Sequence, residues 1–286
     1  MKIGVKKNWG AACALIAENP VVLMPTLMIG FIEFLCLELI YFFPRPPLMY
    51  LIDPVVRKFF GEVFIHYPGN MLVSMKLVRG AEMFVYVFAG ALLYAVTIIM
   101  VKDIAGRKTP KLRAGVTKAV KRYAGFFLLG ALLVAVFYFE QKLSVLLIQK
   151  GIRLLVKFSP AFIVKAAPHF MSLALFLNNV VLTVFTVLVL PFMVIRDLSI
   201  FKAFVKSLVF GMRGFWGLFV MILVPYLLHL PMLAMKSFPV VLAGKTFPEV
   251  IFLILAADII VVLAVEAFVV VSVSLCVINS AEGDRI

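Results

Sequence analysis

The sequence predicts an all-α membrane protein, a polytopic bundle of about six transmembrane helices with basic amphipathic helices at the membrane interface. Composition supports this, since 64% of the 286 residues are hydrophobic and only 15% are charged. A soluble domain of this size needs more polar residues to cover its surface. Besides the high hydrophobic and low charged content, the sequence contains apolar runs long enough to cross a bilayer. We expect one membrane domain, residues 1–286, with spans at 21–42, 83–100, 123–139, 170–195, 215–235 and 250–277.

The first element is a predicted interfacial helix, residues 3–18. Lys6 and Lys7 open an Ala-rich apolar run that is too short to cross the membrane before Glu18 interrupts it. Asn19–Pro20 then ends this helix, because the residue before a proline is pushed out of the helical region. The first span follows directly.

The most basic segment, residues 102–122, lies between the second and third spans. It contains eight Lys or Arg residues. Thr109–Pro110 predicts a helix start within it, with Thr as the cap and Pro at the first helical position. We therefore expect a short basic helix at one membrane surface.

A second basic helix is predicted between the fourth and fifth spans. Ser199, Lys202, Lys206 and Arg213 recur at helical spacing and form one polar stripe, and Asp197 precedes them as a candidate N-terminal cap. The remaining positions are apolar, so the segment is too hydrophobic for water and too charged to cross a bilayer. We expect it to lie in the interface with its apolar face down.

The distribution of Lys and Arg predicts the orientation. With six spans, the N-terminus, the 102–122 loop and the 196–213 loop lie on one side, and that side carries the denser positive charge. Short cytoplasmic loops are enriched in Lys and Arg. The sequence therefore predicts a multi-pass protein of the cell (inner) membrane with both termini in the cytoplasm.

The stretch 191–225 also resembles known families. A span that contains Pro191 and ends in Val-Ile is followed by an acidic residue, by Ala203-x-x-x-Ser207 and by Arg-Gly-Phe-Trp at 213–216. This pattern is similar to the six-helix families grouped around the YciC-like membrane proteins and the membrane domain of bacterial glycerophosphoryl diester phosphodiesterases. The resemblance implies a six-helix architecture and a link to lipid metabolism. It implies no catalytic residue, because the phosphodiesterase chemistry belongs to a separate soluble domain.

The sequence contains none of the common motifs of catalytic or cofactor-binding sites. It has no phosphate-binding loop, zinc-protease motif, nucleophile elbow or dinucleotide fingerprint. The three histidines, His66, His169 and His229, are far apart, and the cysteines form no C-x-x-C pair, so we expect no metal site and no cofactor. We expect no enzyme activity and, without a soluble basic module, no nucleic-acid partner.

Polar residues inside the spans are the first group of candidate site residues. An ionised carboxylate at the centre of a span costs at least about 2.5 to 3.5 kcal/mol, and we expect no Lys or Arg at matching depth to offset it. If the side chains converge, they would bind a cation or relay protons for a transporter; otherwise they bridge helices or snorkel to the surface. The candidates are Glu33, Asn178, Asn179, Asp258 and Glu266.

Basic residues on the predicted inner side are the second group. Cationic amphipathic helices at one face favour binding of anionic membrane lipid or of a membrane or peripheral protein partner, although plain interfacial anchoring would use the same residues. The leading hypothesis is a non-catalytic protein that binds or organises lipid, or a membrane subunit of an envelope assembly. The alternative is a transporter of a small solute or lipid. The headgroup candidates are Lys111, Lys118, Lys121, Arg122, Lys202, Lys206 and Arg213.

Overall fold

The computed structural model describes residues 3–67, 69–156, 161–236 and 247–283, and these residues form helices and turns without a strand. The predicted all-α fold class is confirmed. Within these ranges, six helical segments are long and apolar enough to cross a membrane, so the chain is an integral membrane protein. The segments are Pro20–Tyr41, Gly69–Ala105, Tyr123–Gly151, Leu173–Ile195, Phe215–Lys236 and Val250–Ser280.

The second segment begins well before residue 83, where the sequence places its start. It consists of α4 (Gly69–Val85), a π-helical turn (Tyr86–Gly90) and α5 (Ala91–Ala105) in direct succession. Three charged residues of α4 lower its hydrophobicity and conceal it from a hydropathy argument; they are Lys76, Arg79 and Glu82.

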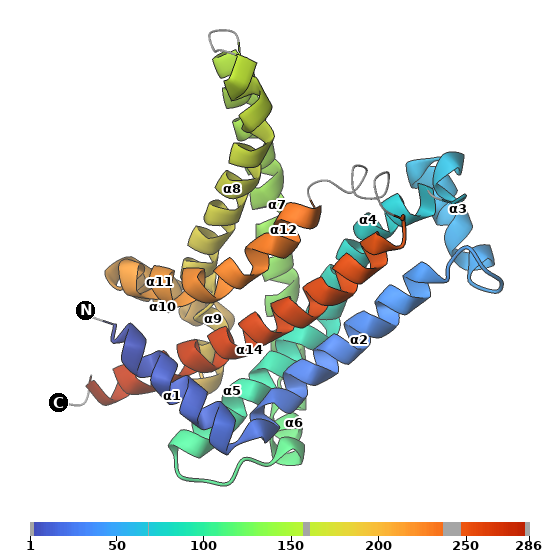
Figure 1. Ribbon diagram of the computed structural model, residues 1–286. Coiled ribbons are helices and arrows are strands. Elements are labelled where there is room, and N and C mark those ends of the chain that lie inside the picture. The colour runs from blue at the N-terminus through green and yellow to red at the C-terminus, as the bar shows by residue number, and fades with distance from the viewer. Residues whose placement is uncertain (1–2, 68, 157–160, 237–246, 284–286) are drawn as a thin grey trace.

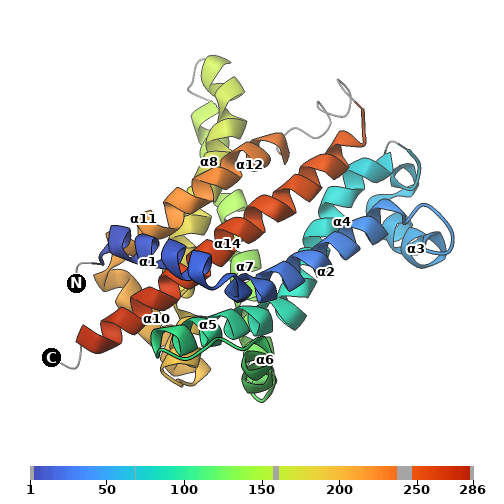
Figure 2. The ribbon, with the colours of Figure 1, turned by 60° about the horizontal axis from the view of Figure 1, so that its bottom comes forward.

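Two helices form the centre of the molecule. In α5, every residue from Leu93 to Val101 is buried. The helix α5 packs on α14 (Val250–Gly283), which also contacts α2 (Met24–Tyr41), α1 (Val5–Glu18) and α9 (Val189–Ile195). Figure 2 shows α14 running between α2 and α12 (Leu230–Lys236). Apolar packing around α5 and α14 therefore holds the other helices in place.

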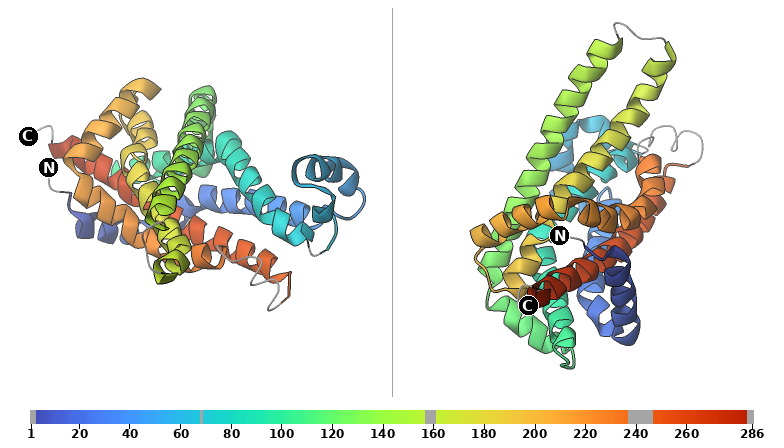
Figure 3. Two further views of the ribbon diagram at one scale, coloured as in Figure 1. Left: turned by 90° about the horizontal axis from the view of Figure 1, so that it is seen from above. Right: turned by 90° about the vertical axis from the view of Figure 1, so that its left-hand side faces the viewer.

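The helices α7 (Tyr123–Val156) and α8 (Ala161–Thr186) form a hairpin that extends away from the other helices (Figures 1 and 3). At 1.5 Å per residue, the 34 residues of α7 make a helix of about 50 Å. A bilayer has a hydrocarbon core of about 30 Å. The hairpin must therefore tilt in the membrane or project beyond it.

Three of the basic amphipathic helices lie toward one end of the molecule, while a fourth, α3 (Met49–Phe60), carries Arg57 and Lys58 at the other end. At the first of these ends α1, α6 (Leu112–Val120), α10 (Ile200–Arg213) and the C-terminal end of α14 lie together (Figures 1 and 3). The elements α6 and α10 thus share one end of the bundle. We call this end the basic end.

Candidate functional site

The buried face of α10 is built from small residues. Ala203, Ser207 and Gly211 follow one another at intervals of four and are buried. The Ser207 hydroxyl donates a hydrogen bond of 2.6 Å to the carbonyl of Phe185, near the break between α8 and α9. A Cβ atom at position 211 would lie 3.0 Å from the Phe185 ring and 3.3 Å from the carbonyl oxygen of Val184. Small side chains thus let α10 approach the fourth span closely.

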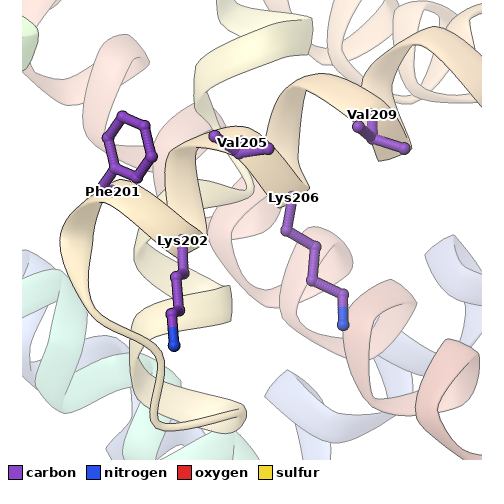
Figure 4. Close-up of a pocket in the computed structure, with 5 residues that line it drawn as sticks. All are labelled: Phe201, Lys202, Val205, Lys206 and Val209. Atoms are coloured by element: carbon purple, nitrogen blue, oxygen red, sulfur yellow. The ribbon is translucent and has the colours of Figure 1, made fainter.

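The other side of α10 carries two exposed stripes. One is apolar, and its residues Phe201 and Met212 are 78% and 64% exposed, with Val205 and Val209 between them. The pocket in Figure 4 is an open surface of this one helix, and there Lys202 and Lys206 extend away from Phe201. The second stripe is cationic and consists of the exposed side chains of Lys202, Lys206 and Arg213.

Two cations close to α6, Lys102 and Arg122, contact the C-terminal end of α9. The Lys102 ammonium donates to the carbonyl oxygens of Val194 (3.3 Å) and Ile195 (3.0 Å). The Arg122 guanidinium donates to the carbonyl of Met193 at 3.3 Å. The last carbonyls of a helix have no partner within the helix, and its C-terminal end carries partial negative charge. Lys102 and Arg122 therefore stabilise the C-terminus of α9.

Two ion pairs complete this arrangement. Lys118 pairs with Asp103 at 3.2 Å, and Arg122 pairs with Asp197. Asp197 does not cap α10 as expected. Ser199 occupies the cap position and makes no side-chain capping bond. Asp197 adopts a left-handed backbone conformation and pairs with Arg122.

The predicted headgroup residues therefore divide into two groups. Lys118 and Arg122 take part in ion pairs within the protein. The other five also have exposed side chains, as Lys118 has, and the Lys206 ammonium lies 5.8 Å from the centroid of the Phe192 ring; the five are Lys111, Lys121, Lys202, Lys206 and Arg213.

Asp258 has two cationic or hydrogen-bonding partners. Its side chain is 4% exposed, and one carboxylate oxygen lies 2.7 Å from His229 Nε2 while the other lies 2.5 Å from Lys236 Nζ. The expectation that no Lys or Arg lies at matching depth is wrong. Lys236 closes the fifth span, and a lysine's flexible four-carbon stem lets the charge lie far from its own backbone.

Three further carboxylates surround this group. Glu266 accepts a hydrogen bond from the Tyr94 hydroxyl. Glu33 lies close enough to Glu266, Asp258 and Glu82 for their charges to interact. These acids come from α2, α4 and α14, and their charges influence one another. We call Glu33, Glu82, Asp258 and Glu266 the acidic cluster.

Asn178 belongs to a different contact. Its amide nitrogen donates to Glu140 and to the Ser144 hydroxyl at 2.8 Å, and Ser144 donates to Glu140 at 2.6 Å. This network joins α8 to α7. Asn179 is half-buried, and its carbonyl accepts a bond from Thr183 at 2.8 Å. Asn178 thus joins the two helices of the hairpin and bonds to α7 rather than to the acidic cluster, whereas the Asn179–Thr183 bond lies within α8.

Glu82, His229 and Lys236 are the functional candidates that the sequence reasoning missed. A signal for Glu82 does exist: Arg79, Glu82 and Tyr86 recur at intervals of three and four, which places them on one helix face. No comparable signal predicts the pairing of His229 and Lys236 with Asp258, because it depends on how two spans pack.

The described residues include no group of three or more His, Cys, Asp or Glu side chains that could hold a metal ion. Comparison of the chain with models of protein families, with curated proteins and with solved structures finds no match. The function is therefore inferred from the geometry of the basic end and of the acidic cluster.

Proposed function

We propose that this protein is a non-catalytic membrane protein that binds anionic lipid headgroups through α10. The observation that supports this proposal is the pair of exposed stripes on α10, one apolar and one formed by Lys202, Lys206 and Arg213. A helix with this surface lies in the membrane interface, with apolar side chains among the acyl chains and cations at the phosphates. Each basic residue near an anionic surface contributes about 1 kcal/mol.

We further propose that the basic end faces the cytoplasm of an inner membrane. The N-terminal helix, α6, α10 and the C-terminal end of α14 gather at this end, and cytoplasmic membrane surfaces carry both anionic lipid and the Lys-rich loops of membrane proteins. The resemblance of residues 191–225 to YciC-like membrane proteins agrees with a role linked to lipids. The same surface also suits a peripheral protein with acidic groups, as expected for a membrane subunit of a larger assembly.

The test is retention of anionic lipid by the purified protein. The variant K202Q/K206Q/R213Q should bind phosphatidylglycerol roughly 100-fold more weakly than the original protein, because three contributions of about 1 kcal/mol are lost. Native mass spectrometry in a mixed phosphatidylglycerol and phosphatidylcholine background measures this change.

The matched control removes three exposed lysines that lie away from the basic end, as K58Q/K142Q/K150Q. This variant has the same net charge as the first, and it should keep the original lipid retention. Equal losses in both variants, or unchanged retention in the α10 variant, would contradict lipid binding by α10.

A second candidate function is transport of a small solute or lipid through the acidic cluster. The observation that favours it is that carboxylates from α2, α4 and α14 lie within electrostatic range of one another at membrane depth. Acidic residues at this depth are costly, and they often mark ion or proton pathways. The variant E33Q/E266Q tests this candidate in liposomes. Loss of flux in a folded variant with unchanged lipid retention supports transport.

A further inference from the structure

The connection between the first and second spans contains α3, and six spans place it on the membrane face opposite α10. The first span ends at Tyr41 and the second begins at Gly69, so both ends of this connection lie at the same face. The chain crosses the membrane three more times before it reaches α10, which follows the fourth span. In agreement with this count, α3 lies at the end of the molecule away from the basic end (Figures 1 and 3).

Side-chain contacts place this connection level with the start of the sixth span. The ring of Tyr41 lies 4.7 Å from the ring of Phe252, centroid to centroid, and α14 begins at Val250. The Tyr67 hydroxyl donates a hydrogen bond of 3.5 Å to Glu249. The end of the first span, the start of the sixth and the end of the connection therefore meet at one level, which is the membrane surface on this side.

One face of α3 packs on the start of the second span. Val56 of α3 and Val73 of α4 belong to a small apolar core at this end, and Phe60 packs against it. The Lys76 ammonium of α4 lies 5.3 Å from the centroid of the Phe60 ring. Val73 and Lys76 belong to about the first two turns of α4. These contacts hold α3 beside the end of a span.

A neighbouring face of α3 is apolar and exposed. Its side chains recur at intervals of four and are 73%, 48% and 71% exposed; they are Leu51, Val55 and Phe59, which we call the α3 stripe. Each of them directly precedes a residue that packs against the small core, so the stripe borders the packed face. Asp53 and Arg57 directly follow such residues and lie on the opposite flank.

The charge of this connection is nearly balanced. Arg57 pairs with Glu62 at 3.1 Å, and the Lys58 ammonium lies 5.8 Å from the centroid of the Phe59 ring. Between the two spans, three cations stand against two acids: Arg45, Arg57 and Lys58 against Asp53 and Glu62. The sequence of α10, by contrast, has three cations and no acid. Attraction to anionic headgroups is therefore much weaker at α3 than at α10.

We propose that α3 is a second interfacial helix, whose stripe inserts among the acyl chains of the leaflet opposite α10 and does so whatever the charge of the lipid headgroups. Removal of apolar side chains from water is favourable in proportion to the area removed. The acyl chains that surround the adjoining spans are the nearest apolar phase for the stripe. Tyr50 and Tyr67 are 70% and 59% exposed beside it, and tyrosine is enriched at membrane–water boundaries.

This proposal goes beyond lipid binding by α10 and does not depend on it. The two helices contact opposite leaflets, and they use different forces, apolar insertion at α3 and charge at α10. A loss of lipid retention in the α10 variant leaves the depth of α3 unchanged, so the failure of one proposal is distinguishable from the failure of the other.

Spin labels attached one at a time test the proposal in lipid nanodiscs that hold one copy of the protein. The labelled variants are Leu51→Cys, Phe59→Cys and Arg57→Cys, in a background in which Cys13, Cys36 and Cys276 are replaced by Ala. All three labelled positions are exposed, so the labels leave the small core intact. Collisions with oxygen, which concentrates in lipid, and with a nickel chelate, which stays in water, report the depth of each label.

Labels at Leu51 and Phe59 should collide more often with oxygen and lie about 5–10 Å below the headgroups. The label at Arg57, on the opposite flank, should collide more often with the nickel chelate. Leu128→Cys is the lipid-facing reference, because Leu128 is 58% exposed on the third span. The depths should be equal in discs of phosphatidylcholine alone and in discs that also contain phosphatidylglycerol.

Three results would overturn the proposal. Labels at Leu51 and Phe59 that meet the nickel chelate as often as the label at Arg57 would show that the stripe faces water. Spin–spin broadening at Leu51 in discs with two copies, together with a water-exposed stripe in discs with one, would identify a second copy of the chain as the occupant. Insertion that requires phosphatidylglycerol would show that charge, and not apolar burial, holds α3 at the membrane.

Discussion

The helices α6 and α10 lie at the same end of the molecule and are both basic and amphipathic, yet their charges serve different contacts. Lys118 of α6 and the adjacent Arg122 pair with Asp103 and Asp197. The cations of α10 have exposed side chains beside an exposed apolar stripe. Basic residues on an amphipathic helix can therefore either hold the protein together or face the membrane surface.

The difference follows from what lies within reach of each helix. Near α6, Asp103 and Asp197 supply negative charge, and the C-terminus of α9 supplies carbonyl oxygens to Lys102 and Arg122. α10 uses its buried small-residue face for packing, so its long cationic side chains point outwards. Charge pattern alone does not separate these two cases, whereas the positions of the neighbouring acceptors do.

The largest effect is expected where α10 packs on the fourth span. Gly211→Val places a branched side chain against Phe185 and the Val184 carbonyl, which would lie only 3.0 Å and 3.3 Å from its Cβ atom. Overpacking of this kind costs about 1–3 kcal/mol of unfolding free energy. Unfolding in mixed detergent micelles measures it. Gly80→Ala is the control, because nothing lies within 4 Å of a Cβ there; an equal loss in both variants would contradict close packing at position 211.

An intermediate effect is expected for Lys102→Met. The variant loses the ammonium bonds to Val194 and Ile195 at the C-terminus of α9, which should lower the unfolding free energy by about 1 kcal/mol. Retention of phosphatidylglycerol should stay unchanged, because this charge is used within the protein. A variant with original stability and reduced lipid retention would reverse the assignment of Lys102.

The smallest effect is expected for Lys118→Gln. Its pair with Asp103 is partly exposed, and such pairs contribute about 0.2–1 kcal/mol. The thermal unfolding midpoint should fall slightly, while lipid retention should match that of the original protein. Loss of lipid equal to that of Lys202→Gln would show that α6 and α10 act alike, and the comparison between them would fail.

The sequence predicted the fold class because the stability of each helix in the bilayer depends mainly on the length and hydrophobicity of its own segment. It also predicted a short basic amphipathic helix between the fourth and fifth spans, and α10 (Ile200–Arg213) lies there with the side chains of Lys202, Lys206 and Arg213 exposed. The candidate acids were less predictable. Glu33, Asp258 and Glu266 stand out in apolar runs, but Glu82 lies in a charged stretch of α4 that the hydropathy pattern does not mark as a span.

By itself, the sequence determined that this is an all-helical membrane protein, because long apolar runs are stable only where lipid or other helices surround them. The tertiary structure alone decided which charges meet. His229 and Lys236 reach Asp258 from 29 and 22 residues away, and Arg122 reaches Asp197 from 75. Hydropathy depends on the residues within one segment, whereas an ion pair depends on how two helices are packed against each other, and no local pattern records that arrangement.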